Sequence, residues 1–170
     1  MKLLGVVLAG GESRRFGSDK ARALLGGVAL ADHARATLAP FVAEVALSGA
    51  EGIADCPAPG LGPLGGICGA LRYAEARGFE AVLTIGCDTP FVPAEVLARL
   101  AAAPGAAFVA DTPIIGRWPA GLGDALVARL RADPDRSMRA WCAAIGAVRV
   151  DAPEIANINR PEDLAALARA

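Results

Sequence analysis

The sequence predicts an α/β fold, a three-layer sandwich in which helices cover both faces of a mostly parallel sheet. Apolar runs typical of strands buried on both faces alternate along the chain with segments of helical periodicity. Such alternation favours parallel strands joined by helical crossovers. The chain has 170 residues, of which 54% are hydrophobic and 21% charged, so it can bury the core of one domain. We therefore predict a single domain over residues 1–170.

Each predicted strand is an apolar run that stops near a glycine or a charged residue. The run LLGVVLA leads into two glycines, and the run EAVLTIGCD ends on an aspartate. Right-handed crossovers place the carboxyl ends of parallel strands at one edge of a sheet, where ligands bind in such folds. The predicted strands span residues 3–9, 43–49, 80–88, 106–111 and 147–152.

The predicted helices are marked by proline, glycine and capping residues at their ends. The segment PLGGICGALRYAEARG begins with proline and ends with glycine, as helices commonly do. Asn159, followed by proline and acidic residues, is a natural N-cap for a closing helix. Another helix opens at Thr89 or at Pro93. The predicted helices span residues 29–41, 63–78, 89–103 or 93–103, 120–133, 137–146 and 159–170.

Charge, hydropathy and cysteine spacing exclude several classes of function. The net charge of -1 gives no basic excess for a nucleic-acid partner. Any binding of phosphate must therefore depend on a local cluster of positive charge. No apolar run is long enough to cross a membrane, and the short apolar start lacks a small-residue cleavage site, so we expect a cytoplasmic protein. The four cysteines lack metal-type spacing and are expected to be reduced thiols.

The stretch VVLAGGESRRFGSDKARALL combines two glycines after a strand with a cluster of cations. Gly10 and Gly11 allow the backbone to approach a ligand, and free N–H groups in such a turn form an anion-binding concavity. Arg14, Arg15 and Lys20 add positive charge suited to phosphates. The alternative is an ordinary structural turn, because paired glycines after a strand are common.

Two better-known phosphate loops do not fit this stretch. Gly17 is followed by Ser18 and Asp19, whereas a Walker loop needs Gly-Lys-Ser/Thr. The GxGxxG fingerprint of dinucleotide-binding proteins is also absent from the stretch.

The stretch TIGCDTPFVP places Asp88 at the carboxyl end of a predicted buried strand. One carboxylate, together with water and substrate phosphates, suffices for Mg²⁺. Asp88 is therefore a candidate metal ligand that shares a sheet edge with the glycine-rich stretch, and the alternative is a helix cap or turn residue.

These motifs resemble those of the nucleotidyltransferases whose N-terminal pattern is Leu-x-x-Gly-x-x-x-Arg-Met…Lys. The form LAGG is similar to that of molybdenum cofactor guanylyltransferases, and CDTPF, GPLGG and NINRPEDL are similar to further motifs of that family. Phe16 stands where methionine is usual, and the stretch 11–20 is shorter by about one residue. The resemblance implies a Rossmann-like nucleotide-binding sheet, with a nucleotide part over about 1–100 and an acceptor part over about 101–170.

The resemblance also assigns residues to the nucleotide. It implies that Asp55 contacts the guanine base, that Asp88 holds Mg²⁺, and that Lys20 with Arg15 offsets the charge of the triphosphate. Ser48 stands where some members have an asparagine that contacts nucleotide. The remaining nucleotide-binding candidates lie in the first motif and are Leu8, Ala9, Gly10 and Gly11.

The acceptor side is assigned by the same resemblance. Asn157 and Asn159 are expected to contact the pterin, although Arg160 replaces the usual threonine and Asn159 also suits a helix cap. Trp118 either stacks on the pterin or packs in the core. The candidates for binding the acceptor phosphate are Arg136, Ser137 and Arg139, whereas His33 is expected to be structural.

The implied reaction transfers GMP from GTP to molybdenum–molybdopterin, releases pyrophosphate and needs Mg²⁺. Transient contact with other cofactor-biosynthesis proteins or with molybdoenzymes is expected, and contact with nucleic acid or a membrane is not. Three alternatives remain: a relative that uses CTP or another acceptor, a nucleotide-binding module without catalysis, and a plain interaction domain in which the motifs are turns.

Overall fold

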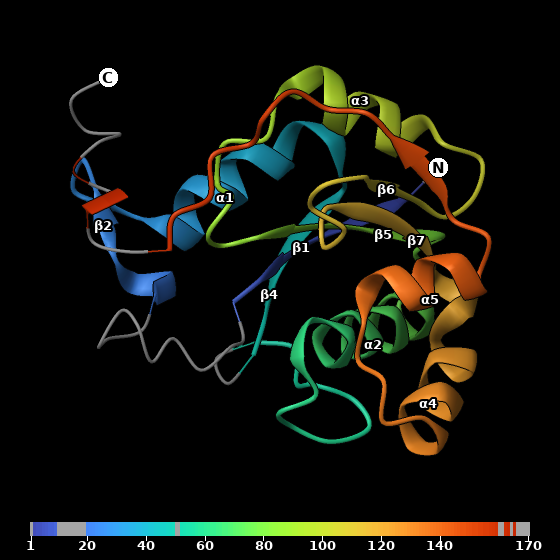
Figure 1. Ribbon diagram of the computed structural model, residues 1–170. Helices are drawn as coiled ribbons and strands as arrows, with labels where there is room; N and C mark the ends of the chain where they lie inside the picture. The colour runs from blue at the N-terminus through green and yellow to red at the C-terminus, as the bar shows by residue number, and fades with distance from the viewer. Residues whose placement is uncertain (1, 10–19, 50–51, 160–161, 164, 166–170) are drawn as a thin grey trace.

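The computed structural model describes residues 2–9, 20–49, 52–159, 162–163 and 165. A six-stranded sheet of order β4-β1-β5-β7-β6-β8 runs through the middle of the molecule (Figure 1). Its strands are β1 (Leu3–Leu8), β4 (Glu44–Ser48), β5 (Ala81–Gly86), β6 (Ala107–Val109), β7 (Gly116–Pro119) and β8 (Val148–Val150). The predicted α/β sandwich is thereby confirmed, and five of these strands fall on predicted strands.

The central part of the sheet is parallel. β1 pairs in parallel with β4 on one side and with β5 on the other. Every residue of β1 and β5 is buried, which explains why both appear in the sequence as continuous apolar runs. Leu8 lies opposite both Ser48 and Gly86, so the carboxyl ends of these strands meet at one edge.

β7 is a strand that the sequence analysis did not predict. It lies antiparallel to both β5 and β6, so the sheet is mostly rather than wholly parallel. Its sequence, GRWP, offers neither an apolar run nor an alternating pattern. Trp118 of β7 is fully buried, and its Nε1 donates a hydrogen bond to Thr84 Oγ1 on β5 at 2.8 Å. Trp118 therefore packs in the core and does not line an acceptor pocket.

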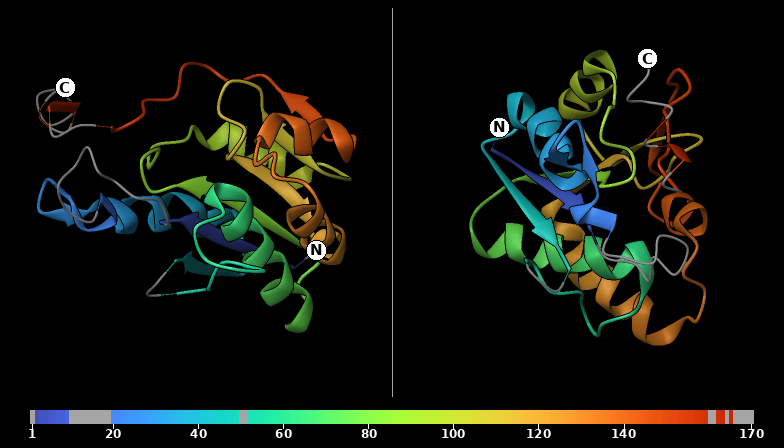
Figure 2. Two further views of the ribbon diagram at one scale, coloured as in Figure 1. Left: turned by 60° about the horizontal axis from the view of Figure 1, so that its bottom comes forward. Right: turned by 90° about the vertical axis from the view of Figure 1, so that its left-hand side faces the viewer.

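Helices cover both faces of the sheet, as Figure 2 shows from two sides. α1 (Leu30–Leu38) and α3 (Ala94–Ala102) lie on one face, with buried residues in one core cluster. α2 (Gly62–Ala76), α4 (Gly123–Ala132) and α5 (Met138–Ala144) contribute to a second cluster on the other face. There the ring of Trp141 of α5 packs against that of Trp118 at a tilt of 42°, with ring centroids 4.7 Å apart.

The structure distinguishes between the two predicted starts of α3. The helix begins at Ala94 with Pro93 as its N-cap. Thr89 instead belongs to the turn after β5, where the Gly86 N–H donates to Thr89 Oγ1 at 3.2 Å. Short 3₁₀ turns, η2 (Ala39–Phe41) and η3 (Ala120–Leu122), precede β4 and α4.

A small hairpin between β1 and α1 also escaped prediction. η1 (Lys20–Arg22) leads into β2 (Leu24–Leu25), which pairs with β3 (Val28–Ala29). Gly26 and Gly27 form the turn with φ of 59° and 79°, the positive values that a tight two-residue hairpin turn needs. His33 of α1 bonds to the Leu25 carbonyl through Nε2 at 2.9 Å, so His33 has a structural role.

The chain after β8 returns to the carboxyl edge of the sheet. Ile158 is fully buried, and its N–H donates to the Asp88 carbonyl at 2.8 Å. Residues 162, 163 and 165 have helical backbone, and the remainder of the predicted helix 159–170 beyond Asn159 lies outside the described residues. Within the described ranges, no helix is long and apolar enough to span a membrane.

Candidate nucleotide-binding site

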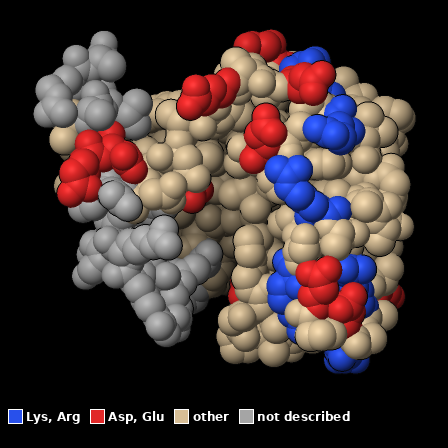
Figure 3. All heavy atoms as spheres, in the orientation of Figure 1, with Lys and Arg blue, Asp and Glu red and all other residues tan. Residues whose placement is uncertain are grey.

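The candidate site lies at the carboxyl edge of β4, β1 and β5. In Figure 1 the ends of β1 and β4 lie at the lower left, and Figure 3 shows the surface hollowed beside α2 in the same orientation. Cys87 extends the pairing past β5 by donating its N–H to the Leu8 carbonyl at 3.2 Å. Ala9 follows β1 directly and is half-buried.

Three of the residues predicted to bind nucleotide converge on one glycine of α2. A Cβ built on Gly66 would lie 3.2 Å from Ser48 Oγ, 3.3 Å from Leu8 Cδ2 and 3.7 Å from Asp55 Oδ1. Gly66 has no side chain, so the ends of β1 and β4 can lie close to the first turns of α2. The structure thus brings together Leu8, Ser48 and Asp55, which are separated by up to 47 positions in the sequence.

Asp55 has an unusual environment for a carboxylate. Its Oδ1 atom is buried and has no hydrogen-bond partner among the described residues. Its Oδ2 atom lies against α2, 3.3 Å from where a Cβ on Gly65 would stand. Leaving a buried acceptor without a partner costs about 1–3 kcal/mol, and more for a charged group. Among the described residues, no donor offsets this cost for Oδ1.

Asp88 lies just beyond β5, between the end of β1 and the returning tail. A Cβ on Gly86 would lie 2.2 Å from Asp88 Oδ1, so the carboxylate folds back over the end of the strand. The side chain is half-buried. A single carboxylate beside a predicted triphosphate site fits the donor set of Mg²⁺, which takes its other oxygens from phosphates and water. Among the described residues no three His, Cys, Asp or Glu side chains cluster as a metal cage.

The predicted cationic part of the site is described only in part. Lys20 opens η1, at the start of the hairpin that leads into α1, and its side chain is outside the described residues. Gly10, Gly11, Arg14 and Arg15 also lie outside them. The convergence of Lys20 with Asp88 on one triphosphate therefore stays a prediction.

The tail brings two predicted acceptor residues to the same edge. Asn157 and Asn159 are exposed and flank the buried Ile158, which is bonded to Asp88. The Asn159 N–H donates to Asp163 Oδ2 at 2.8 Å, the kind of bond that closes the start of a helix. The sequence analysis missed Ile158, whose local signal is no more than an apolar side chain between two polar ones.

The three candidates for acceptor phosphate lie around the start of α5. Ser137 is its N-cap, and its Oγ accepts from the Ala140 N–H at 3.2 Å. Arg136 donates to the Leu130 carbonyl at 3.0 Å and to the Asp133 carbonyl, so it ties the end of α4. Arg139 is exposed. The structure thus gives Ser137 and Arg136 local structural bonds, and phosphate binding by these residues stays a prediction.

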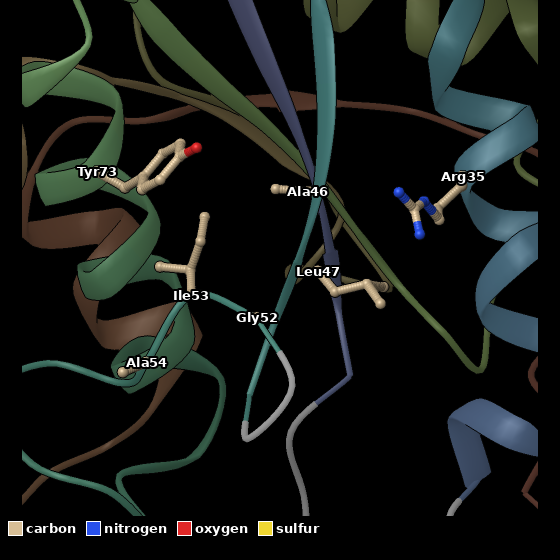
Figure 4. Close-up of a pocket in the computed structure, with 7 residues that line it drawn as sticks. All are labelled: Arg35, Ala46, Leu47, Gly52, Ile53, Ala54 and Tyr73. Atoms are coloured by element: carbon tan, nitrogen blue, oxygen red, sulfur yellow. The ribbon is translucent and has the colours of Figure 1, made fainter.

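A separate cavity of about 470 Å³ opens along the edge strand β4. Figure 4 shows Tyr73 of α2 and Arg35 of α1 on opposite sides of that strand. Asp88 does not line this cavity, but three of its lining residues, 52–54, directly precede Asp55.

Comparison with known proteins identifies the family. The model of the MobA-like NTP transferase domain matches residues 5–150. The chain belongs to this family. It is a nucleotidyltransferase, as the first motif predicts.

Relatives in this family extend over nearly the whole chain. A protein of Cereibacter sphaeroides named molybdenum cofactor guanylyltransferase is 40% identical, with 97% of this chain and 95% of that protein covered. A protein of the same name from Sinorhizobium fredii is 38% identical, with 94% and 87% covered.

Solved structures agree on the fold. Molybdopterin-guanine dinucleotide biosynthesis protein A from Archaeoglobus fulgidus superposes with a TM-score of 0.76 at 23% identity, covering 98% of this chain and 97% of that one. The 2-C-methyl-D-erythritol 4-phosphate cytidylyltransferase of Thermus thermophilus gives 0.65 at 20% identity, covering 100% and 99%. Because proteins named for different reactions share this fold, the choice of base must come from site residues.

Proposed function

We propose that this enzyme transfers GMP from GTP to the terminal phosphate of molybdenum–molybdopterin and releases pyrophosphate. The similarity to molybdenum cofactor guanylyltransferases over almost the full length of both chains supports the reaction. The observation that carries the choice of guanine is the buried Oδ1 of Asp55 beside Gly66, which has no hydrogen-bond partner among the described residues. A guanine edge presents two adjacent N–H donors, and a carboxylate is suited to accept both.

The protein's tasks in this reaction are alignment and charge neutralisation. The nucleophile is a phosphate oxygen of the acceptor, which is already anionic, so the reaction needs no strong general base. Gly10, Gly11 and nearby N–H groups would hold the triphosphate, while Lys20 and Arg15 would offset charge on the transferring and leaving groups. Ala9, directly after β1, would begin this cradle.

Asp88 is the residue that would hold Mg²⁺. When bound there, the ion would supply Lewis-acid stabilisation of the phosphate oxygens. Asn157 and Asn159 would bind the pterin, since Ile158 seats the tail against Asp88. Ser137 stays a further acceptor candidate. A cytoplasmic location and transient contact with cofactor-biosynthesis proteins or molybdoenzymes belong to the same proposal.

The test measures pyrophosphate release by the full chain with molybdenum-loaded molybdopterin and Mg²⁺. GTP and CTP are compared in parallel, and omission of the acceptor is the control. We expect release that requires both GTP and the acceptor. Equal release from CTP would overturn the choice of guanine, and GTP binding without any release would indicate a nucleotide-binding module that lacks catalysis.

A further inference from the structure

His33 is the only histidine of the chain, and its side chain contacts two segments that border the proposed triphosphate site. On one side, its Nε2 lies 2.9 Å from the Leu25 carbonyl oxygen. A carbonyl oxygen only accepts hydrogen bonds, so Nε2 carries the proton. Leu25 belongs to β2, which follows the 3₁₀ turn η1 that begins at Lys20. His33 therefore holds the hairpin that continues the cationic segment.

The same side chain contacts the turn that carries Asp88. The ring of His33 lies 5.4 Å from that of Phe91 between centroids, with an interplanar angle of 60°. Aromatic rings at this separation and tilt attract one another. Phe91 stands three residues after Asp88 and is 44% exposed, so burial in the core does not by itself fix its position. The contact with His33 thus helps to hold the segment after Asp88 against α1.

A second bond from α1 supports this contact. Thr37 is four residues after His33, so the two side chains lie on the same face of the helix. Thr37 Oγ1 donates to the Pro90 carbonyl oxygen at 2.6 Å. At the other end of the turn, Thr89 is buried and its N–H donates to the Gly86 carbonyl at 3.1 Å. The turn is therefore fastened to β5 on one side and to α1 on the other.

We propose that His33 is a positioning residue for nucleotidyl transfer, which fixes the spacing between the hairpin after Lys20 and the turn that carries Asp88. Its action is indirect, through its contacts with Leu25 and Phe91. One of the two joined segments is proposed to neutralise phosphate charge, and the other is proposed to hold Mg²⁺. This inference rests on the proposed function, because that function places both segments around one triphosphate, whose reaction depends on their spacing.

A histidine suits this task because one ring makes both contacts. Its N–H donates to a backbone carbonyl, while the ring itself packs against a second ring. A glutamine at this position retains an N–H donor but has no ring, and a phenylalanine retains a ring but has no donor. The variants His33→Gln and His33→Phe therefore remove one contact each.

The first test observes the imidazole of the unaltered protein by NMR. Because the untagged chain has one histidine, its ring gives one set of signals, which His33→Gln identifies by their loss. GTP and Mg²⁺ are added to the full chain at constant pH. We expect the Nε2 signal to shift as the nucleotide binds, because both joined segments then contact the triphosphate. A signal that stays in place at saturation, with binding measured by calorimetry, would overturn the proposal.

The second test measures the Mg²⁺ concentration that gives half-maximal pyrophosphate release. A smaller folded fraction lowers the amount of release but does not move this concentration. His33→Gln and His33→Phe should each raise it at least about fivefold, a part of the hundredfold that a misplacement of about 1 Å can cost. The control is Arg35→Gln, which alters the side of α1 that faces the cavity at β4 and should change nothing. Unaltered Mg²⁺ dependence in His33→Gln would refute positioning through Phe91.

Amide hydrogen exchange without nucleotide separates this inference from the proposed function. His33→Gln should speed exchange at the Thr89 N–H in the turn more than at the Leu30 N–H, which donates to the Ala23 carbonyl at 2.9 Å beside the hairpin. Equal exchange at Thr89 in the two proteins would contradict the link to the turn. If the unaltered protein binds no GTP, the proposed function fails, and exchange at Thr89 still decides whether His33 holds this turn.

Discussion

Replacing Gly66 by alanine separates stability from nucleotide binding at the proposed guanine site. An alanine in place of an interior helical glycine stabilises a helix by about 1 kcal/mol. Against this gain, the new Cβ would lie 3.2 Å from Ser48 Oγ and 3.3 Å from Leu8 Cδ2, closer than the ordinary contact of about 3.5–4.0 Å. Overpacking of this kind costs about 1–3 kcal/mol. We therefore expect the free energy of unfolding to change by no more than about 2 kcal/mol.

Binding should respond more strongly than folding in this variant. Relief of the crowding requires Ser48 or Leu8 to move by a few tenths of an ångström, and both lie beside Asp55, the proposed acceptor for guanine. We expect GTP affinity to fall at least about tenfold, equivalent to about 1.4 kcal/mol. Calorimetry with GTP and Mg²⁺ measures the affinity, and denaturant unfolding measures the stability.

A matched control is available in η3. A Cβ on Gly121 would have no heavy atom within 4 Å, so Gly121→Ala should leave GTP affinity unchanged. A folded Gly66→Ala protein that binds GTP as tightly as the original would refute the placement of the base beside Asp55 and Ser48.

Four further predictions address the site and its surroundings. Asp88→Ala should fold but lose at least about a hundredfold in turnover, and near-native pyrophosphate release would remove its metal role. Lys20→Ala should impair GTP kinetics more than unfolding free energy; unchanged kinetics would contradict charge neutralisation by this lysine. Asp55→Asn should relax the preference for GTP over CTP, and unaltered selectivity in a nucleotide panel would exclude it from base recognition. Because the pKa of Cys68 is raised from 9.0 to about 12 by burial, its contribution to stability is complete below pH 9 and is lost as pH rises toward 12. Between these pH values the free energy of unfolding should fall by up to about 1.4 kcal/mol per pH unit, and Cys68→Ala should lack this contribution. Equal pH dependence of unfolding in the two proteins would contradict the raised pKa.

The predictable part of the fold is the part in which burial leaves a pattern in the sequence. β1 and β5 are buried on both faces, so each appears as a continuous apolar run. β7 is held by its neighbours rather than by its own pattern, because Trp118 is fixed by Thr84 across the sheet. The strands β2 and β3 have two residues each, too few to show periodicity. The local sequence signal of this hairpin is the Gly26–Gly27 turn.

The same division holds for the candidate site. The rule that parallel strands end at one edge predicts that the glycine-rich stretch and Asp88 share that edge, and the register of β1 with β5 brings the described ends of these strands together there. The contact of Gly66 with Asp55 and the bond from Ile158 to Asp88 are long-range features that only the packed chain reveals. The resemblance identified which residues to expect, and the tertiary structure shows which of the described ones come together.

The bond between Ile158 and Asp88 has a consequence for where this enzyme can be shortened. The family match stops at residue 150, and the sheet is complete with β8, so a boundary there would appear natural. A protein that ends at residue 150 would retain all six strands of the sheet. It would lose the segment around Ile158, whose N–H donates to the Asp88 carbonyl in the turn after β5. Fusion partners and deletions at the carboxyl terminus should therefore be judged by turnover as well as by the yield of folded material.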